Sequence, residues 1–186
     1  MANVWEKKGI DLAEKILLDC VFYESECMEN LVNRTFNIFG EFRNYERFLS
    51  EILYCGIFIG VHCINVSCQK HGVSERDKGF FSRAYADRVL YEFRNPTGFI
   101  FDIYTLNKSE LTRRLDIYTK YVNLNPYGEV DDWMDYKLLS RILCDLSCIN
   151  INHRGYGELI NTVAEYLNFV AVCTDMDVFS AWLESK

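Results

Sequence analysis

Proline and glycine are scarce in this chain of 186 residues, which contains only 2 prolines and 10 glycines. Few residues therefore interrupt regular backbone structure, and this scarcity favours long helices over a many-stranded β-sandwich. Disorder is disfavoured too, because 49% of the residues are hydrophobic and 15% are aromatic. Length and composition together predict one folded domain with a substantial core.

The signatures of several enzyme classes are also missing. Neither GxGxxG nor GxxxxGK[ST] occurs, so the sequence offers no glycine-rich loop to hold a phosphate. The 3 histidines, the usual general bases, stand in neither a GxSxG nor a Cys–His nucleophile context. Nothing in the sequence therefore specifies a catalytic nucleophile with its base.

A surplus of positive charge is absent, since 27 acidic residues outnumber 20 basic ones and the formal net charge is −7. This charge disfavours duplex nucleic acid as a partner, because duplex binding needs a basic face. Bases do gather at 70–88 and 113–120 with aromatic residues nearby, as in single-strand binders. Acids interleave with the bases of the first group, which is also typical of solvated helix faces. The net negative charge is compatible with a basic protein as the partner.

No hydrophobic run reaches the ~20 residues that a transmembrane helix needs. The longest extends from Ile52 to Val66, and His62 and Asn65 interrupt it, which predicts a buried core helix and no membrane contact. The first residues show no basic segment followed by an apolar one, as a secretory signal would. We therefore expect a cytoplasmic protein whose 8 cysteines are reduced.

Hydrophobic residues recur at helical spacing along most of the chain. They predict an all-α, single compact domain over 1–186, with about seven or eight helices around a buried central helix at about 46–70. A weak internal boundary falls at 123–128, and 99–105 could form a short strand or part of a helix. In the second helix, Phe36 is expected to face inward. The expected helices are 9–24, 29–42, 46–70, 74–95, 109–122, 131–149, 155–172 and 174–183. Ser74 is the expected N-cap of the fourth of them, and Thr174 or Asp175 that of the last.

The central segment carries a stripe of small residues at i, i+4, i+7 and i+11, namely Gly56, Gly60, Cys63 and Ser67. Small side chains let the backbone of another helix approach closely, which offsets the cost of glycine inside a helix. We expect a close crossing with a helix at 155–172 or 131–148. A leucine at position 56 or 60 would then be strongly destabilising.

An acidic cluster at 131–135 is the clearest candidate for chemistry. On a helix, Asp131 and Asp135 lie at i and i+4, where two carboxylates can share Mg²⁺, with Asp132 beside them. Acids in a first helical turn also stabilise its positive end, and this is the interpretation that we favour. It requires no metal and no other cofactor.

The spacing Asp131-Asp132-x-x-Asp135 resembles the metal-binding motif of isoprenoid synthases, which are also all-helical. The resemblance implies a divalent-metal-dependent enzyme. Near the C-terminal end of the sequence, Asp177, Ser180 and Glu184 loosely resemble that family's second metal motif, with Met176 where the family has Asn or Asp. The two motifs lie closer together than in that family, and the chain is shorter than its helical barrel requires.

Histidine and cysteine could in principle form a zinc site. The candidates are His62, Cys63, Cys68, His71, Cys144, Cys148 and His153. On one helix the first four point in widely separated directions, so they cannot converge on one ion. A pair such as Cys144 and Cys148 would supply only half a site, and we interpret these cysteines as buried thiols.

Acidity, abundant tyrosine and the missing catalytic signatures favour a non-catalytic regulatory protein that binds another protein. An inhibitor, an immunity protein or an anti-defence factor would act in this way. The first alternative is a helical enzyme that uses a divalent metal at Asp131, Asp132 and Asp135. The second is a homodimer with a structural role. The sequence does not specify catalytic or partner-binding residues.

Overall fold

The computed structural model describes residues 3–17, 19, 26–39, 45–94, 108–123 and 135–183. This part of the chain forms seven α-helices and no β-strand, which confirms the expected all-α domain. The segment 99–105 and nearly all of the boundary at 123–128 lie outside the described residues. The helices are α1 (Val4–Ile16), α2 (Glu26–Phe39), α3 (Tyr45–Lys70), α4 (Glu75–Arg94), α5 (Lys108–Asn123), α6 (Tyr136–Leu146) and α7 (Tyr156–Leu183).

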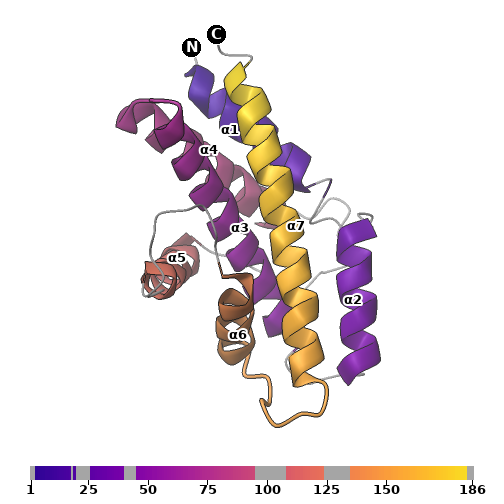
Figure 1. Cartoon of the computed structure of the whole chain (residues 1–186). Coiled ribbons are helices and arrows are strands. Elements are labelled where there is room, and N and C mark those ends of the chain that lie inside the picture. The colour runs from indigo at the N-terminus through magenta and orange to yellow at the C-terminus, as the bar shows by residue number, and fades with distance from the viewer. Residues whose placement is uncertain are drawn as a thin grey trace.

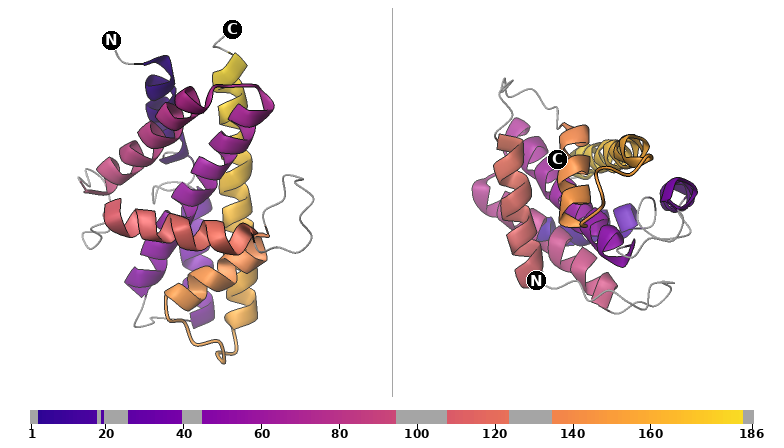
Figure 2. Two further views of the ribbon diagram at one scale, coloured as in Figure 1. Left: turned by 90° about the vertical axis from the view of Figure 1, so that its left-hand side faces the viewer. Right: turned by 90° about the horizontal axis from the view of Figure 1, so that it is seen from below.

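Two long helices, α3 and α7, run side by side through the bundle, and the other helices pack around them (Figure 1). α3 packs mainly against α4, α5, α6 and α7, whereas α7 packs mainly against α1, α2, α3 and α6. α5 lies across the long axis of the bundle, on the side opposite α2 (Figure 2). The fold therefore has two central helices, of which the sequence indicated the first.

The central helix α3 is buried as expected: Ile52, Cys55, Ile59 and Ile64 are all 0% exposed. By length and composition alone, its segment Arg47–Lys70 could cross a membrane. The other helices bury 67% of its most apolar stretch, as they would in the core helix of a soluble protein. Burial by protein thus accounts for its apolar character.

The C-terminal part of the described chain is one helix, α7, where two helices with a break near Thr174 were expected. Thr174 is 0% exposed, and its hydroxyl donates a hydrogen bond of 2.7 Å to the Val170 carbonyl oxygen four residues earlier. A threonine hydroxyl satisfied in this way can stay inside a helix and does not act as a cap. The capping interpretation of Thr174 was therefore wrong.

Local capping interactions explain one end of each of three other helices. Ser74 caps α4 as expected, because its Oγ accepts a hydrogen bond of 3.1 Å from the Asp77 backbone N–H. α3 and α6 both end in a Schellman turn, in which one residue adopts a positive φ. That residue is Gly72 (φ 67°) after α3 and Cys148 (φ 56°) after α6.

The stripe of small residues on α3 does not form one close helix crossing. A Cβ at Gly56 would meet no atom within 4 Å. A Cβ at Gly60 would overlap the ring of Tyr85, which belongs to α4 and not to the helices at 155–172 or 131–148. Cys63 of the stripe does face α7, where its Sγ donates a hydrogen bond of 3.9 Å to the Ala171 carbonyl oxygen. α7, which contains nearly all of 155–172, is the main packing partner of α3, as expected, but the two glycines of the stripe do not create a close approach to it.

Alanine at these two glycines should have effects of opposite sign. Gly56→Ala should raise the free energy of unfolding by about 0.5–1 kcal/mol, since a helix-interior glycine is replaced without a clash. Gly60→Ala should lower it by about 1–3 kcal/mol, because the buried Tyr85 must move. Urea unfolding of both variants measures the difference. Equal effects would show that Tyr85 does not restrict position 60.

The tightest helix contact lies elsewhere, between α1 and α4. A Cβ at Gly9 would lie 2.5 Å from the Phe81 carbonyl oxygen and 2.9 Å from the Tyr85 amide nitrogen. These are backbone atoms of α4, and the α1–α4 pair is the most extensive helix contact among the described residues. Glycine at position 9 is therefore what lets the two backbones approach.

Candidate functional site

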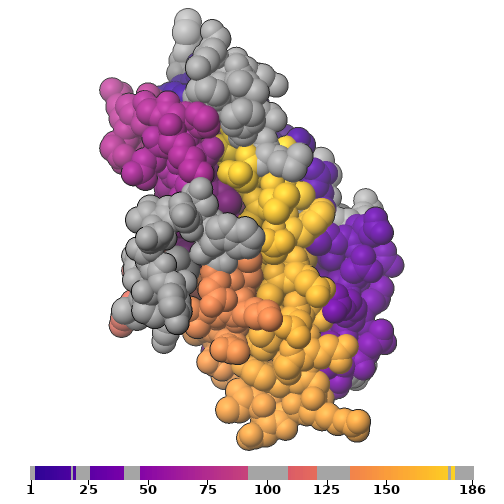
Figure 3. All heavy atoms as spheres, in the orientation of Figure 1, coloured from indigo at the N-terminus to yellow at the C-terminus, as the bar shows by residue number. Residues whose placement is uncertain are grey.

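An open groove lies between α2 and α7. Its volume is about 490 Å³, and apolar surface predominates in its lining. Figure 3 shows the side chains of these two helices forming adjoining surfaces along one side of the molecule. The lining residues are Glu26, Cys27, Asn30, Leu31 and Arg34 of α2 with Thr162, Glu165, Tyr166 and Phe169 of α7.

The groove is bounded by two helices that run in opposite directions. Arg34 forms an ion pair with Glu165, and Phe39, at the end of α2, stacks on His153, just before α7 begins. The ring centroids of that stacked pair are 4.0 Å apart. Later positions in α2 therefore face earlier positions in α7, which defines an antiparallel pair. Among the described helices, α2 packs mainly against α7.

The floor of the groove contains buried Leu31 and Tyr166, which are 2% and 5% exposed. Phe169 beside them is 44% exposed, although phenylalanine is normally buried. Phe36, which was expected to face inward, is 40% exposed on α2. That expectation was wrong because α2 has neighbours on only part of its surface. Apolar side chains thus remain in solvent on both helices of the groove.

Cys27 is the one thiol in the lining of the groove. Burial raises the pKa of this thiol to about 11, and the nearby Cys173 contributes in the same direction. A thiol with this pKa is protonated at neutral pH, whereas the thiolate is the reactive form. The Cys27 thiol is therefore held in its unreactive form.

The acidic cluster is only partly described. Asp135 is the N-cap of α6, and its Oδ1 accepts a hydrogen bond of 3.0 Å from the Leu138 backbone N–H. The favoured capping interpretation is confirmed at this position. Asp131 and Asp132 lie outside the described residues. α6 begins at Tyr136, five residues later than expected, so the described part of α6 does not contain the i, i+4 pair of carboxylates.

The second acidic motif has a different role at its one described side chain. Asp177 forms an ion pair with Lys15 of α1, and the hydrogen bond to Asp177 is the main cause of the raised pKa of Lys15. The side chains of Met176, Ser180 and Glu184 lie outside the description. Asp177 thus connects α7 to α1, and no observation favours a metal at this position.

The candidate zinc ligands do not come together. Among the described residues, no group of three or more His, Cys, Asp or Glu side chains could hold a metal ion. Cys144 is buried, whereas Cys148 is exposed. Burial raises the pKa of Cys144 to about 12 and that of Cys68 to about 11. The buried-thiol interpretation is confirmed for both residues.

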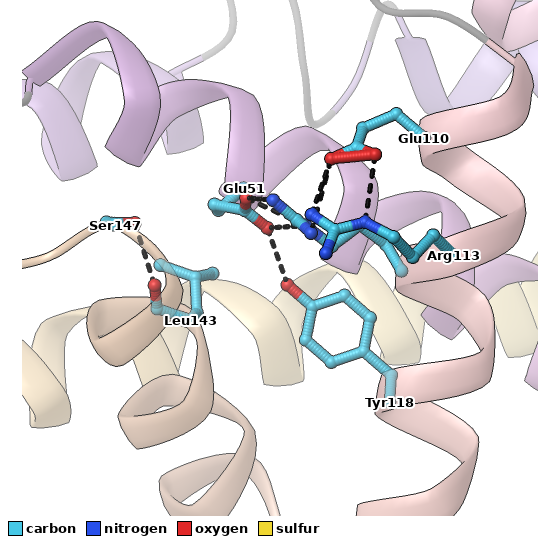
Figure 4. A network of polar contacts seen from close by, with 7 residues as sticks. Glu51, Glu110, Arg113, Tyr118, Leu143 and Ser147 are labelled. Atoms are coloured by element: carbon cyan, nitrogen blue, oxygen red, sulfur yellow. Dashed lines mark hydrogen bonds and ion pairs between the residues drawn. The ribbon is translucent and has the colours of Figure 1, made fainter.

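A buried ion pair joins α3 to α5 (Figure 4). Arg114 Nε donates hydrogen bonds of 2.8 and 2.7 Å to the two carboxylate oxygens of Glu51, and Nη2 donates a further one. Tyr118 Oη donates another of 3.3 Å to Glu51 Oε2. Burial, followed by the nearby acidic groups, raises the pKa of Tyr118 well above its usual value. The side chains of Glu51 and Arg114 are 2% and 5% exposed.

This ion pair was not predicted. Arg114 had been counted in a basic surface group, yet it lies at i+3 from Leu111 and i+4 before Tyr118, on the inner face of its helix. That spacing is a usable signal of burial. Its neighbour Arg113 points outward, where it makes bonds of 3.0 and 2.6 Å with Glu110. Arg113 lowers the pKa of that carboxyl.

The network has a structural role. Each charged group in it already has an oppositely charged partner. Arg114 Nη1, which has no hydrogen bond, lies 3.4 Å from Glu110 Oε1 at ion-pair distance. The α2–α7 groove is therefore the candidate site.

No protein-family model, curated protein or solved structure matches this chain.

Proposed function

We propose that this protein acts without catalysis, by binding another protein in the α2–α7 groove and so regulating or inhibiting it. The observation that carries the proposal is the open apolar groove beside Phe169, which is 44% exposed. Exposed apolar surface next to a polar rim is typical of interaction sites. The proposal places the protein in the cytoplasm, where its cysteines would stay reduced.

An open groove fits a protein better than a small molecule. Small-molecule sites enclose most of their ligand and offer a few converging polar groups. In this groove the Arg34 and Glu165 side chains are 46% and 65% exposed, and each already binds the other. A partner with its own apolar side chains would instead cover Phe169 and the residues beside it.

Site-specific photo-cross-linking tests the proposal. A photoreactive amino acid replaces Asn30 in the groove, and in a second protein it replaces Thr112, which is exposed on α5 on the opposite side. Both proteins are expressed in the cells that naturally produce the chain. We expect a covalent adduct with one partner protein from position 30 and none from position 112. Adducts that are identical at both positions, or absent at position 30, would contradict the proposal.

The mass of the adduct separates the proposal from the homodimer alternative. An adduct between two copies of this chain would have twice its mass of 21.9 kDa. That result would favour the structural homodimer and contradict binding of a different protein. Any other single mass identifies a hetero-partner.

A further inference from the structure

The occupant of the groove can be inferred from shape and charge. We propose that it is an amphipathic α-helix of the partner protein, with an apolar face and basic flanks. This inference rests on the proposed function and adds the chemistry of the partner. Three observations support it: the spacing of the lining residues, the exposed apolar side chains, and the distribution of charge over the helices.

The lining residues form two parallel stripes. On α2, Cys27, Asn30, Leu31 and Arg34 lie at i, i+3, i+4 and i+7. On α7, Thr162, Glu165, Tyr166 and Phe169 have the same spacing. Each stripe covers two helical turns, which is about 10 Å along the axis. A third helix could pack in the trough between them, since helices associate by fitting the ridges of one into the grooves of another.

Uncovered apolar side chains define where that helix would be anchored. Phe169 is 44% exposed at the groove, and Val172, three residues further along α7, is 49% exposed. An amphipathic helix presents apolar residues at i, i+3 or i+4, and i+7, the periodicity that matches this strip. The contact would bury Phe169 and extend the core of the bundle by one more helix.

Charge is distributed unevenly over the described helices. The exposed charged residues of α2 and α7 are Glu26, Glu29, Arg34, Glu158, Glu165 and Asp175, five acids and one arginine. Those of α1, α3, α4, α5 and α6 comprise six acids and ten bases: Asp11, Glu14, Glu75, Asp87, Asp116 and Asp145 with Lys7, Lys15, Arg47, Lys70, Arg76, Arg83, Arg113, Lys120, Lys137 and Arg141.

Acids therefore outnumber bases among the exposed charged residues of the two helices that form the groove. The one arginine of these two helices is already paired with Glu165, which leaves Glu26 in the groove lining, Glu29 three residues further along α2, and Glu158 one turn before Thr162 on α7. Basic residues on the flanks of an incoming helix would complement these carboxylates and steer it to this side. A second copy of the same acidic surface would instead be repelled.

Two designed peptides test the inference on the full chain. Both have about 18 residues, or five helical turns, and carry the same apolar stripe. One has lysine and arginine on its flanks, and the other has glutamate. Fluorescence anisotropy measures binding at low and high salt. We expect the basic peptide to bind at least about tenfold more tightly than the acidic one, with an affinity that falls as salt rises.

Variants distinguish a seated helix from general attraction to an acidic protein. Phe169→Ser should weaken the basic peptide about tenfold by removing the apolar anchor. Glu26→Gln combined with Glu29→Gln should weaken it and reduce its dependence on salt. The matched controls are Val4→Ser on α1, where Val4 is 63% exposed, and Asp116→Asn on α5, and both should leave binding unchanged.

Two outcomes would overturn the inference. The first is equal binding of the two peptides, and the second is binding that Phe169→Ser leaves intact, which would show charge attraction alone. The cross-linked partner segment gives an independent reading. If the segment joined to position 30 is acidic or not helical, the proposed function stands and the inference fails. If position 30 gives no adduct and neither peptide binds at the groove, both fail.

Discussion

Replacing Glu51 by alanine should lower the free energy of unfolding by about 3–5 kcal/mol, because it removes every hydrogen bond of the buried Arg114 charge to a carboxylate and leaves only Glu110, 3.4 Å from Nη1, near it. The Arg114 side chain is only 5% exposed, and three of its hydrogen bonds go to Glu51. For a chain of this length, the melting temperature should fall by roughly 6–20 °C. Urea unfolding and differential scanning calorimetry measure both quantities.

The neighbouring surface pair is the matched control. Arg113 is on the same helix and also binds a glutamate, but its side chain is 58% exposed. Solvent screens such a pair, so Arg113→Ala should change the melting temperature little. The result would contradict the prediction if Glu51→Ala and Arg113→Ala both melted close to the wild-type temperature. Solvent would then reach the Arg114 guanidinium.

A triple variant separates the loss of the ion pair from the cost of one unpaired charge. Glu51→Leu, Arg114→Met and Tyr118→Phe together remove both charges and the hydroxyl that binds Glu51. Apolar replacements of a whole buried ion pair are often neutral or stabilising. We therefore expect the triple variant to recover most of the stability lost in Glu51→Ala. If it is no more stable than that variant, the pair itself stabilises the fold.

Gly9→Ala should destabilise the protein although alanine is the better helix former. The added methyl would lie 2.5 Å from the Phe81 carbonyl oxygen and 2.8 Å from the Ala84 Cβ, so α1 and α4 must separate. Overpacking typically costs about 1–3 kcal/mol, and here the obstacle is backbone that cannot rotate away. The melting temperature should fall by roughly 2–12 °C.

Gly79 in α4 provides the control. It lies in the helix that Gly9 contacts, and a Cβ there would meet no atom within 4 Å. Gly79→Ala should therefore stabilise the protein by about 0.5–1 kcal/mol through helix propensity alone. If Gly9→Ala is as stabilising as Gly79→Ala, α1 and α4 do not approach as closely as this geometry indicates.

The all-α fold and most helix positions could be predicted from local sequence. Hydrophobic periodicity and the scarcity of proline and glycine act within a few residues, so they are visible without any tertiary contact. The buried helix at about 46–70 agrees with α3, and Ser74 caps the next helix. Thr174 was misread because its hydroxyl can bond either a helix end or the carbonyl four residues earlier.

The candidate site could be predicted much less well. Its residues come from α2 and α7, which are separated by about 130 positions, as in the Arg34–Glu165 pair. The spacing of Leu111, Arg114 and Tyr118 could have indicated that Arg114 is buried. Its partnership with Glu51, 63 residues away, depends on α5 crossing α3.

The sequence by itself determined which residues form helices and which stripe on each helix is apolar. The tertiary structure decided which stripes are covered. Gly9 lies against α4 while Gly56 meets no neighbour, and Phe36 and Phe169 remain partly in solvent. The physical reason is that helix formation depends on neighbours in sequence, whereas burial depends on how many other helices pack around each one.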